Sequence, residues 1–185
     1  DTKQNQGDKA FHQSRFDAAI TLYEKAYTIA NKEYQAERSL QQLAKAYTEQ
    51  NNYLLANDTL KRLLLQQERH LGTDHIDLAK TLLEMSRNGI RLNDYPTGLS
   101  YRKRALAITE KSVGPSHLQA ALTLVMLGDY YTMGGYYSQA EKIYRNAISK
   151  SRNASDRGMT LSQAQVGLAV CLSEEGRYAE AATLF

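Results

Sequence analysis

Residues 124–147 read LVMLGDYYTMGGYYSQAEKIYRNA, and this stretch decides the fold. At its centre the turn residue Gly135 precedes the aromatic Tyr137 by two positions, and the small residue Ala140 follows three positions later. The same phrase occurs five times, with intervals of 37, 42, 42 and 41 residues between its aromatics. The copies are Ser14, Phe16, Ala19; Asn51, Tyr53, Ala56; Asn93, Tyr95, Gly98; Gly135, Tyr137, Ala140; and Gly176, Tyr178, Ala181. Such regularity predicts an array of one repeated structural unit.

Further positions are shared at fixed distances from each aromatic. Nine residues before it lie Gly7, Ala44, Ser86, Gly128 and Ala169, and ten after it lie Ala26, Leu63, Ala105 and Ala147. Bulky residues stand ten and thirteen before it, at Leu43, Met85, Leu127 and Leu168 and at Leu40, Leu82 and Leu124. Small side chains let one helix approach another closely, and the bulky ones fill the remaining space. The sequence therefore predicts an all-α protein whose repeats are each a helix, a short turn and a second helix.

These residues resemble the tetratricopeptide repeat (TPR) family, whose signature couples small residues on paired helices with an aromatic after a Gly or Asn turn. The fourth copy matches best, through Leu124, Leu127, Gly128, Tyr131, Gly135, Tyr137, Ala140, Tyr144 and Ala147. The usual period is about 34 residues. The 42-residue spacing here, with loops at 71–75 and 113–117, is similar to the kinesin light chain subtype. The resemblance implies a right-handed α-solenoid of about five antiparallel helix pairs, the TPR superhelix.

The expected organisation is a single array over residues 1–185. Its repeats are expected at 1–32, 33–73, 74–115, 116–156 and 157–185, the last of them incomplete. The first residue is Asp1 and Phe185 falls early in a second helix, which suggests a trimmed piece of a longer chain. Solenoids normally end in a unit with a polar outer face. An uncapped last pair would expose apolar surface and favour self-association there.

Two details of the repeats lead to local predictions. The third copy has Gly89 where others have a tyrosine, and Arg102 where most others have a bulky apolar or aromatic residue, so we expect looser packing there. In the loops that follow the second and third copies, Asp74 and Ser116 are expected to cap the next helix.

Composition and charge exclude several classes of function. The 23 basic and 20 acidic side chains leave a formal net charge of +3, without the basic excess typical of nucleic-acid-binding proteins. No apolar run approaches the roughly 18 residues that a membrane-spanning helix requires. The single cysteine, Cys171, cannot form an internal disulfide and is expected to be a packed thiol. We therefore expect neither a nucleic-acid nor a membrane partner, and a cytoplasmic location.

No constellation of residues predicts catalysis. His70, Asp74, His75 and Asp77 come nearest to a metal cluster, but their spacing straddles a glycine turn and suits loop structure better. The glycines are isolated turn residues and do not form a phosphate-binding loop after a strand. The chain is thus expected to be a non-enzymatic protein without metal or other cofactors.

In the family that the chain resembles, the first helix of each pair lines the concave face. Residues opposite the packing positions, taken at helical spacing, form the expected peptide-binding groove. They are Arg38, Gln41, Lys45, Lys80, Leu83, Arg87, Arg91, Leu122, Val125, Asp129, Met133, Val166 and Val170. Cations gather in copies two and three, and apolar residues in copies four and five. Either these apolar residues form part of a ligand-binding groove, or some are core residues that the helical spacing places on the wrong face by one position.

The leading hypothesis is a protein–protein interaction scaffold that binds an acidic segment with apolar anchors, or a partner domain, in this groove. This hypothesis rests mainly on the resemblance, because tetratricopeptide arrays generally act as scaffolds or recruit other proteins. The carboxylate clamp of chaperone-binding members is not reproduced across Gln4, Asp8, Lys45 and Lys80. Two alternatives remain: a regulatory or sensor array fused to an effector domain, and a self-assembly module.

Overall fold

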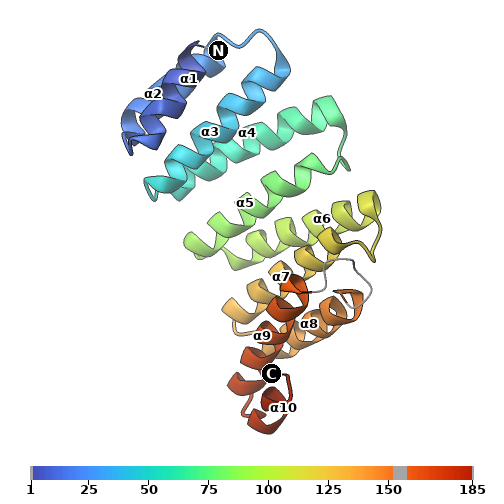
Figure 1. Cartoon of the computed structure of the whole chain (residues 1–185). Helices are drawn as coiled ribbons and strands as arrows, with labels where there is room; N and C mark the ends of the chain where they lie inside the picture. The colour runs from blue at the N-terminus through green and yellow to red at the C-terminus, as the bar shows by residue number, and fades with distance from the viewer. Residues whose placement is uncertain (1, 152–157, 185) are drawn as a thin grey trace. The chain divides into compact units, whose positions relative to one another are not determined.

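The computed structural model describes residues 2–151 and 158–184, and within this part the chain forms helices and no strands. The helices are α1 (Thr2–His12), α2 (Phe16–Thr28), α3 (Glu33–Glu49), α4 (Tyr53–Leu71), α5 (Asp77–Arg91), α6 (Tyr95–Val113), α7 (Leu118–Met133), α8 (Tyr137–Ser151), α9 (Met159–Glu174) and α10 (Tyr178–Ala182). Figure 1 shows them joined in sequence as helical hairpins. The all-α prediction is confirmed.

The chain divides into two compact units, residues 1–101 and 102–185, and the division falls within the sequence of α6. In the first unit α1 packs on α2, α2 on α3, α3 on α4 and α4 on α5. In the second unit α7 packs on α8, α9 contacts both of them, and α10 packs on α9. The repeat boundary expected at residues 156 and 157 lies outside the described residues, as does the terminal Phe185.

The recurring phrase marks the turn inside each hairpin. Its aromatic is the first residue of α2, α4, α6, α8 and α10. Two positions earlier the backbone is left-handed, with φ of 56° at Ser14, 58° at Asn51 and Asn93, 75° at Gly135 and 76° at Gly176. The next amide donates back to the carbonyl five residues earlier, for example Asn52 N to Tyr47 O at 2.8 Å. This left-handed residue ends the helix and lets the following amide pair with a carbonyl that has no partner within the helix. Gly and Asn adopt the left-handed conformation most readily, and one of them stands there in four of the copies.

The small residues mark where the paired helices touch. A Cβ at Gly7 would lie 2.5 Å from the Tyr23 ring, and one at Gly128 would lie 2.6 Å from the Tyr144 ring. Ala19, Ala56 and Ala140 are fully buried. The tyrosines of α2 and α8 thus occupy the volume that the missing side chains leave, as expected for close helix packing. Leu40, Leu43, Leu82, Met85, Leu124, Leu127 and Leu168 are also buried.

The expectation of looser packing in the third copy is wrong at Gly89. A Cβ there would lie 2.9 Å from Gly98 Cα, so α5 and α6 approach to backbone contact. The second departure, Arg102, is 4% exposed. Its guanidinium donates to the Met126 carbonyl and lies 5.1 Å from the ring centroid of Tyr130. A buried arginine therefore replaces the tyrosine and finds both a hydrogen-bond acceptor and an aromatic face.

Histidines accept from backbone amides at the starts of α5 and α7. The N-cap of α7 is His117, whose Nδ1 accepts from Gln119 N at 3.2 Å. The N-cap of α5 is Ile76, and the preceding His75 accepts from Asp77 N at 3.3 Å. The prediction that Ser116 caps α7 is wrong, because the imidazole nitrogen of His117 accepts there as a hydroxyl oxygen would.

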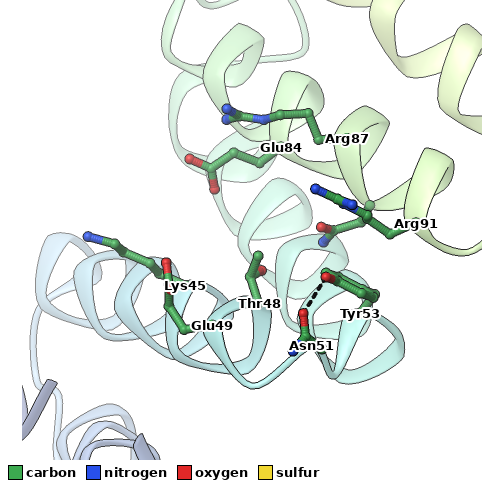
Figure 2. A pocket seen from close by; sticks show the side chains of 9 residues that line it. Lys45, Thr48, Glu49, Asn51, Tyr53, Glu84, Arg87 and Arg91 are labelled. Carbon is green, nitrogen blue, oxygen red and sulfur yellow. Dashed lines mark hydrogen bonds between the residues drawn. The ribbon is translucent and has the colours of Figure 1, made fainter. Parts of the chain in front are cut away.

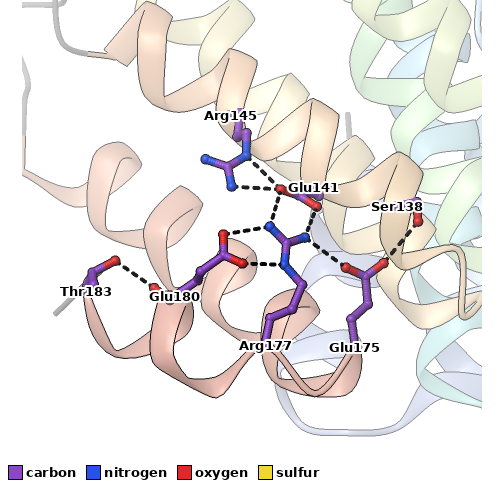
Figure 3. Close-up of polar contacts among 7 residues, drawn as sticks. All are labelled: Ser138, Glu141, Arg145, Glu175, Arg177, Glu180 and Thr183. Atoms are coloured by element: carbon purple, nitrogen blue, oxygen red, sulfur yellow. Dashed lines mark hydrogen bonds and ion pairs between the residues drawn. The ribbon is translucent and has the colours of Figure 1, made fainter.

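A charged cluster attaches the start of α10 to α8 (Figure 3). Arg177 donates to Glu141 and to Glu180, each at 2.7 Å. Arg145 also donates to Glu141, at 2.8 Å from its Nε. These hydrogen bonds lower the pKa of Glu141, chiefly through Arg177, so its carboxylate remains ionised well into acidic solution.

None of the described helices combines the length and apolar character needed to cross a bilayer.

Candidate functional site

The residue immediately after each small packing residue on the first helices is exposed or half-buried. These residues are Asp8, Lys45, Arg87, Asp129 and Val170. Their chemistry changes along the chain from acidic to basic, back to acidic and finally to apolar. Asp8 is half-buried, whereas the other four are exposed and could contact a ligand. Lys45 and Arg87 line a pocket in the first unit, and Asp129 and Val170 line a pocket in the second unit.

The charged pocket lies in the first unit, between α3, α5 and the start of α4, and has a volume of about 460 Å³. Its lining residues are Lys45, Thr48, Glu49, Asn51, Tyr53, Glu84, Arg87, Asn88 and Arg91. Figure 2 shows Glu84 and Arg87 on α5 across from Lys45 and Glu49 on α3. At its edge the Tyr53 hydroxyl donates to Asn51 Oδ1 at 2.6 Å.

Cations outnumber carboxylates in the charged pocket by three to two. Arg87 and Arg91 are exposed, and neither forms an ion pair with any residue in the described part of the chain. Lys45 Nζ lies 4.6 Å from the ring centroid of Phe11. The two guanidinium groups therefore retain their capacity to donate to an anion.

Asn88 is the polar group of the charged pocket that lacks a partner. It is 4% exposed, and its Nδ2 has no hydrogen-bond partner. Leaving a buried donor unsatisfied costs about 1–3 kcal/mol. An acceptor on a bound ligand would remove this cost. Asn88 is not recognisable from the sequence, because a buried asparagine two residues after a packing serine forms no distinctive pattern.

The other predicted groove residues of the first unit do not line the charged pocket. Arg38 forms an ion pair with Asp8, with 2.9 Å between Nη2 and Oδ2. Lys80 is exposed, whereas Gln41 and Leu83 are half-buried. The structure thus brings together three of the seven residues predicted in this unit: Lys45, Arg87 and Arg91.

The apolar pocket lies in the second unit, between α7 and α9 with Tyr144 of α8, and has a volume of about 620 Å³. It is lined by Leu122, Val125, Met126, Asp129, Thr132, Met133, Tyr144, Met159, Ser162, Gln163, Val166, Gly167 and Val170. All six residues predicted in this unit are among them. Met133, Val166 and Val170 are 57%, 48% and 44% exposed. Val125 is 4% exposed and also belongs to the hydrophobic core of this unit.

A hydrogen-bonded network lies behind the apolar pocket. The Tyr144 hydroxyl donates to Asp129 Oδ1 at 2.6 Å, and it lies 3.3 Å from Thr132 Oγ1. Thr132 in turn lies 3.2 Å from the Cys171 sulfur. Burial and the hydrogen bond to Asp129 raise the pKa of Tyr144, so the phenol stays protonated and fixes the carboxylate. The sequence alone gave no indication of this network.

The residues nearest to a metal cluster, and the single cysteine, have other surroundings in the part of the chain that the structure describes. Burial raises the pKa of the Cys171 thiol, which disfavours the reactive thiolate. His70 pairs with Glu33 and Glu37, while His75 contacts Asp77. Within the described part, no group of three or more His, Cys, Asp and Glu side chains could hold a metal ion. The pockets thus offer charge, hydrogen bonds and apolar surface for recognition.

Comparison with known proteins agrees with this architecture. A tetratricopeptide repeat family model matches residues 77–153, which supports the predicted resemblance to the tetratricopeptide repeat family. A comparison with curated proteins finds no significant match. Proteins of this family generally act as non-enzymatic protein–protein interaction scaffolds.

Solved structures of low sequence identity share the fold. The crystal structure of BtubC (BKLC) from P. vanneervenii is 17% identical, with a TM-score of 0.83, and the match covers 96% of this chain and 73% of that one. Nearly identical TPR-like repeats of the kinesin light chain type from Podosopora anserina are 16% identical, with a TM-score of 0.81 and coverage of 99% and 90%. These similarities confirm the α-solenoid fold class and its likeness to kinesin light chain repeats.

Proposed function

We propose that this protein is a non-enzymatic scaffold that binds a peptide segment, or a partner domain, presenting acidic side chains and apolar anchors. The observation that carries the proposal is the charged pocket, where the unpartnered Asn88 amide lies with Arg87 and Arg91. A carboxylate is the ligand group that accepts hydrogen bonds from an amide and two guanidinium groups at once.

The apolar pocket would hold the anchors of the segment. Met133, Val166 and Val170 are exposed around it, and burying one Leu-sized anchor contributes about 1.5–3 kcal/mol. Exposed ion pairs add up to about 1 kcal/mol each. After the cost of ordering a flexible segment, two anchors and a few ion pairs correspond to a dissociation constant on the order of micromolar. The apolar anchors set affinity, and the cations set orientation and the rate of approach.

The experiment begins with peptide-phage selection against the full chain. A fluorescein-labelled copy of the most enriched acidic peptide is then titrated by fluorescence anisotropy. Arg87→Glu reverses a charge in the charged pocket, and Lys80→Glu reverses an exposed charge of α5 outside it. Lys25→Glu makes the same charge change on an exposed position of α2, outside the charged pocket.

We expect Arg87→Glu to weaken binding about tenfold and to reduce its salt dependence, with a smaller effect at Lys80 and almost none at Lys25. Equal affinity of the Arg87→Glu variant and the original chain would overturn the proposed role of the charged pocket. Enrichment of basic peptides alone would also contradict it.

A second candidate is a sensor array that regulates an effector. The observation that favours it is a fold similarity, with a TM-score of 0.78 and 19% identity, to a signal transduction ATPase with a tetratricopeptide repeat sensor from Pyrococcus horikoshii. That match covers 98% of this chain and 28% of the other. Sequencing the full reading frame that contains this chain tests the sensor candidate, because such a sensor requires an effector domain in the same reading frame. A reading frame that adds only further repeats would remove this candidate.

Self-association through the last hairpin is a further part of the proposal. Tyr178, the first residue of α10, is 70% exposed. Light scattering at several concentrations should show a mass that rises with concentration, and Tyr178→Ser should reduce the rise. A monomer at all concentrations would rule out self-association. The cytoplasmic location expected from the sequence stays a prediction.

A further inference from the structure

Asp129 is the charged residue of the otherwise uncharged apolar pocket, considering the lining residues that the structure describes. It has a close counterpart in the first unit, Asp8. Each aspartate follows a packing glycine, and each accepts a hydrogen bond from the tyrosine that packs on that glycine, Tyr144 or Tyr23. The two carboxylates therefore have the same local setting and can be compared directly.

The two aspartates differ in what compensates their charge. Asp8 Oδ2 forms an ion pair at 2.9 Å with Arg38, which lies fifteen residues before the aromatic Tyr53. Fifteen residues before the aromatic Tyr178 stands Gln163, which lines the apolar pocket. The second unit thus has a neutral residue at the repeat position that carries the cation in the first unit.

The Asp129 carboxylate retains binding capacity. Tyr144 donates to Oδ1, and no Lys or Arg of the described chain forms an ion pair with Asp129. Asp129 is exposed and lines the pocket, so its negative charge is accessible to a ligand there. Because Tyr144 holds the carboxylate in one orientation, a partner cation would meet a preorganised acceptor.

We propose that the apolar pocket recognises a peptide stretch in which a lysine or arginine adjoins an apolar side chain. The apolar side chain lies against Val166, Val170 and Met133, while the cation pairs with Asp129. This inference rests on the proposed function and makes it more specific. The acidic side chains of the partner bind at the charged pocket, and a basic residue accompanies its apolar anchor.

Charge complementarity selects this occupant over an acidic one. An acidic residue beside the anchor would place two carboxylates close together in a partly desolvated site, where like charges repel. The apolar lining of the pocket strengthens both the attraction and the repulsion relative to open water. Met126, Met133 and Met159 give the lining adaptable thioether side chains. The pocket is therefore selective for charge and tolerant of the shape of the apolar side chain.

Three fluorescein-labelled peptides with the core Leu-Val-X-Leu in a Gly-Ser frame, where X is Lys, Gln or Glu, test the inference by anisotropy with the full chain. We expect the Lys peptide to bind about tenfold more tightly than the Glu peptide, with the Gln peptide between them. Asp129→Asn keeps the acceptor for Tyr144 and removes only the charge, so it should reduce the ratio to about twofold or less. Asp8→Asn is the matched control and should leave the ratio unchanged. Val166→Asn should weaken all three peptides if they bind in this pocket.

Equal binding of the three peptides, still weakened by Val166→Asn, would overturn the inference and leave the proposed function intact. A Lys preference that persists in Asp129→Asn would overturn it as well. If no peptide binds at about 1 mM, the apolar pocket is not a docking site for such segments. The acidic-peptide titration with Arg87→Glu then decides the proposed function separately.

Discussion

The hydroxyl of Tyr144 donates a 2.6 Å hydrogen bond to Oδ1 of Asp129, and this bond connects the core of the second unit to the apolar pocket. Tyr144 is 1% exposed, and its ring packs against Gly128 of α7 and Gly167 of α9. The first unit repeats the arrangement, with 2.9 Å between the Tyr23 hydroxyl and Asp8 Oδ1. In both units a buried phenol therefore holds a carboxylate whose other oxygen can pair with a cation.

Replacing Tyr144 with phenylalanine should separate the hydrogen bond from the packing. The ring keeps its place between the glycines, while Asp129 loses a donor. We expect Tyr144→Phe to lower the free energy of unfolding by about 1–2 kcal/mol, measured by urea denaturation with circular dichroism. Tyr137→Phe is the control, since this half-buried tyrosine takes no part in the network of Tyr144, Asp129 and Thr132. Equal unfolding midpoints for Tyr144→Phe and the original chain would contradict the structural role of the bond.

Adding one methyl group at Gly167 should disturb the same ring. A Cβ there would overlap the ring of Tyr144 and lie 2.7 Å from its hydroxyl oxygen. We expect Gly167→Ala to lower the free energy of unfolding by about 1–3 kcal/mol, since overpacking forces side chains and backbone to shift.

Gly158→Ala is the matched control for Gly167→Ala. It makes the same chemical change where no heavy atom lies within 4 Å of the new Cβ. Its effect should stay within about 0.5 kcal/mol. Similar losses at both positions in urea denaturation would show that the result does not depend on contact with Tyr144.

The repeated aromatic phrase predicted much of the fold because helix packing and turn geometry act locally. Phe16 and Tyr137 begin their helices as the phrase indicates, and Gly7 and Gly128 lie where two helices touch. Each of these features follows from a small residue or a left-handed turn at a fixed spacing. The looser third copy was not confirmed, because Gly89 meets another glycine, Gly98, which allows closer approach.

The sites were less predictable from the sequence than the helices. Helical periodicity places Asp129 and Val166 each on the face of its own helix that lies opposite the packing positions. Both residues line the apolar pocket. Periodicity does not give the pairing of Arg38 with Asp8, which joins residues thirty apart and removes Arg38 from the available cations. Nor does it reveal a donor without a partner, as at Asn88, because hydrogen bonding depends on the full three-dimensional surroundings.

Ser14 departs from the other turn residues, and its replacement should stabilise the first unit. Its φ is 56°, in the left-handed region, where the other copies have Asn or Gly. A side chain in this conformation costs roughly 1 kcal/mol. We expect Ser14→Gly to raise the free energy of unfolding by about 0.5–1 kcal/mol, measured by urea denaturation. The reverse change, Gly135→Ala at a φ of 75°, should lower it by about 1 kcal/mol. A loss of stability in Ser14→Gly would contradict the argument from strain.

Glu141 should make the attachment of α10 dependent on pH. Its carboxylate accepts from Arg177 and Arg145 (Figure 3), and the pKa of Glu141 is lowered, first by the hydrogen bond with Arg177. A carboxyl group whose pKa is lower in the folded state stabilises that state above its unfolded pKa of 4.5. The stabilisation is lost as the pH falls through the lower folded pKa.

Glu141→Gln should therefore lower the free energy of unfolding by about 1–2 kcal/mol at pH 7, and the difference from the original chain should shrink as the pH falls below 4.5. Urea denaturation at a series of pH values measures both quantities. Glu174→Gln, on an exposed position of α9, is the control and should have little effect at any pH. A Glu141→Gln difference that stays constant from neutral to acidic pH would show that lost packing, and not the charge of Glu141, accounts for the change.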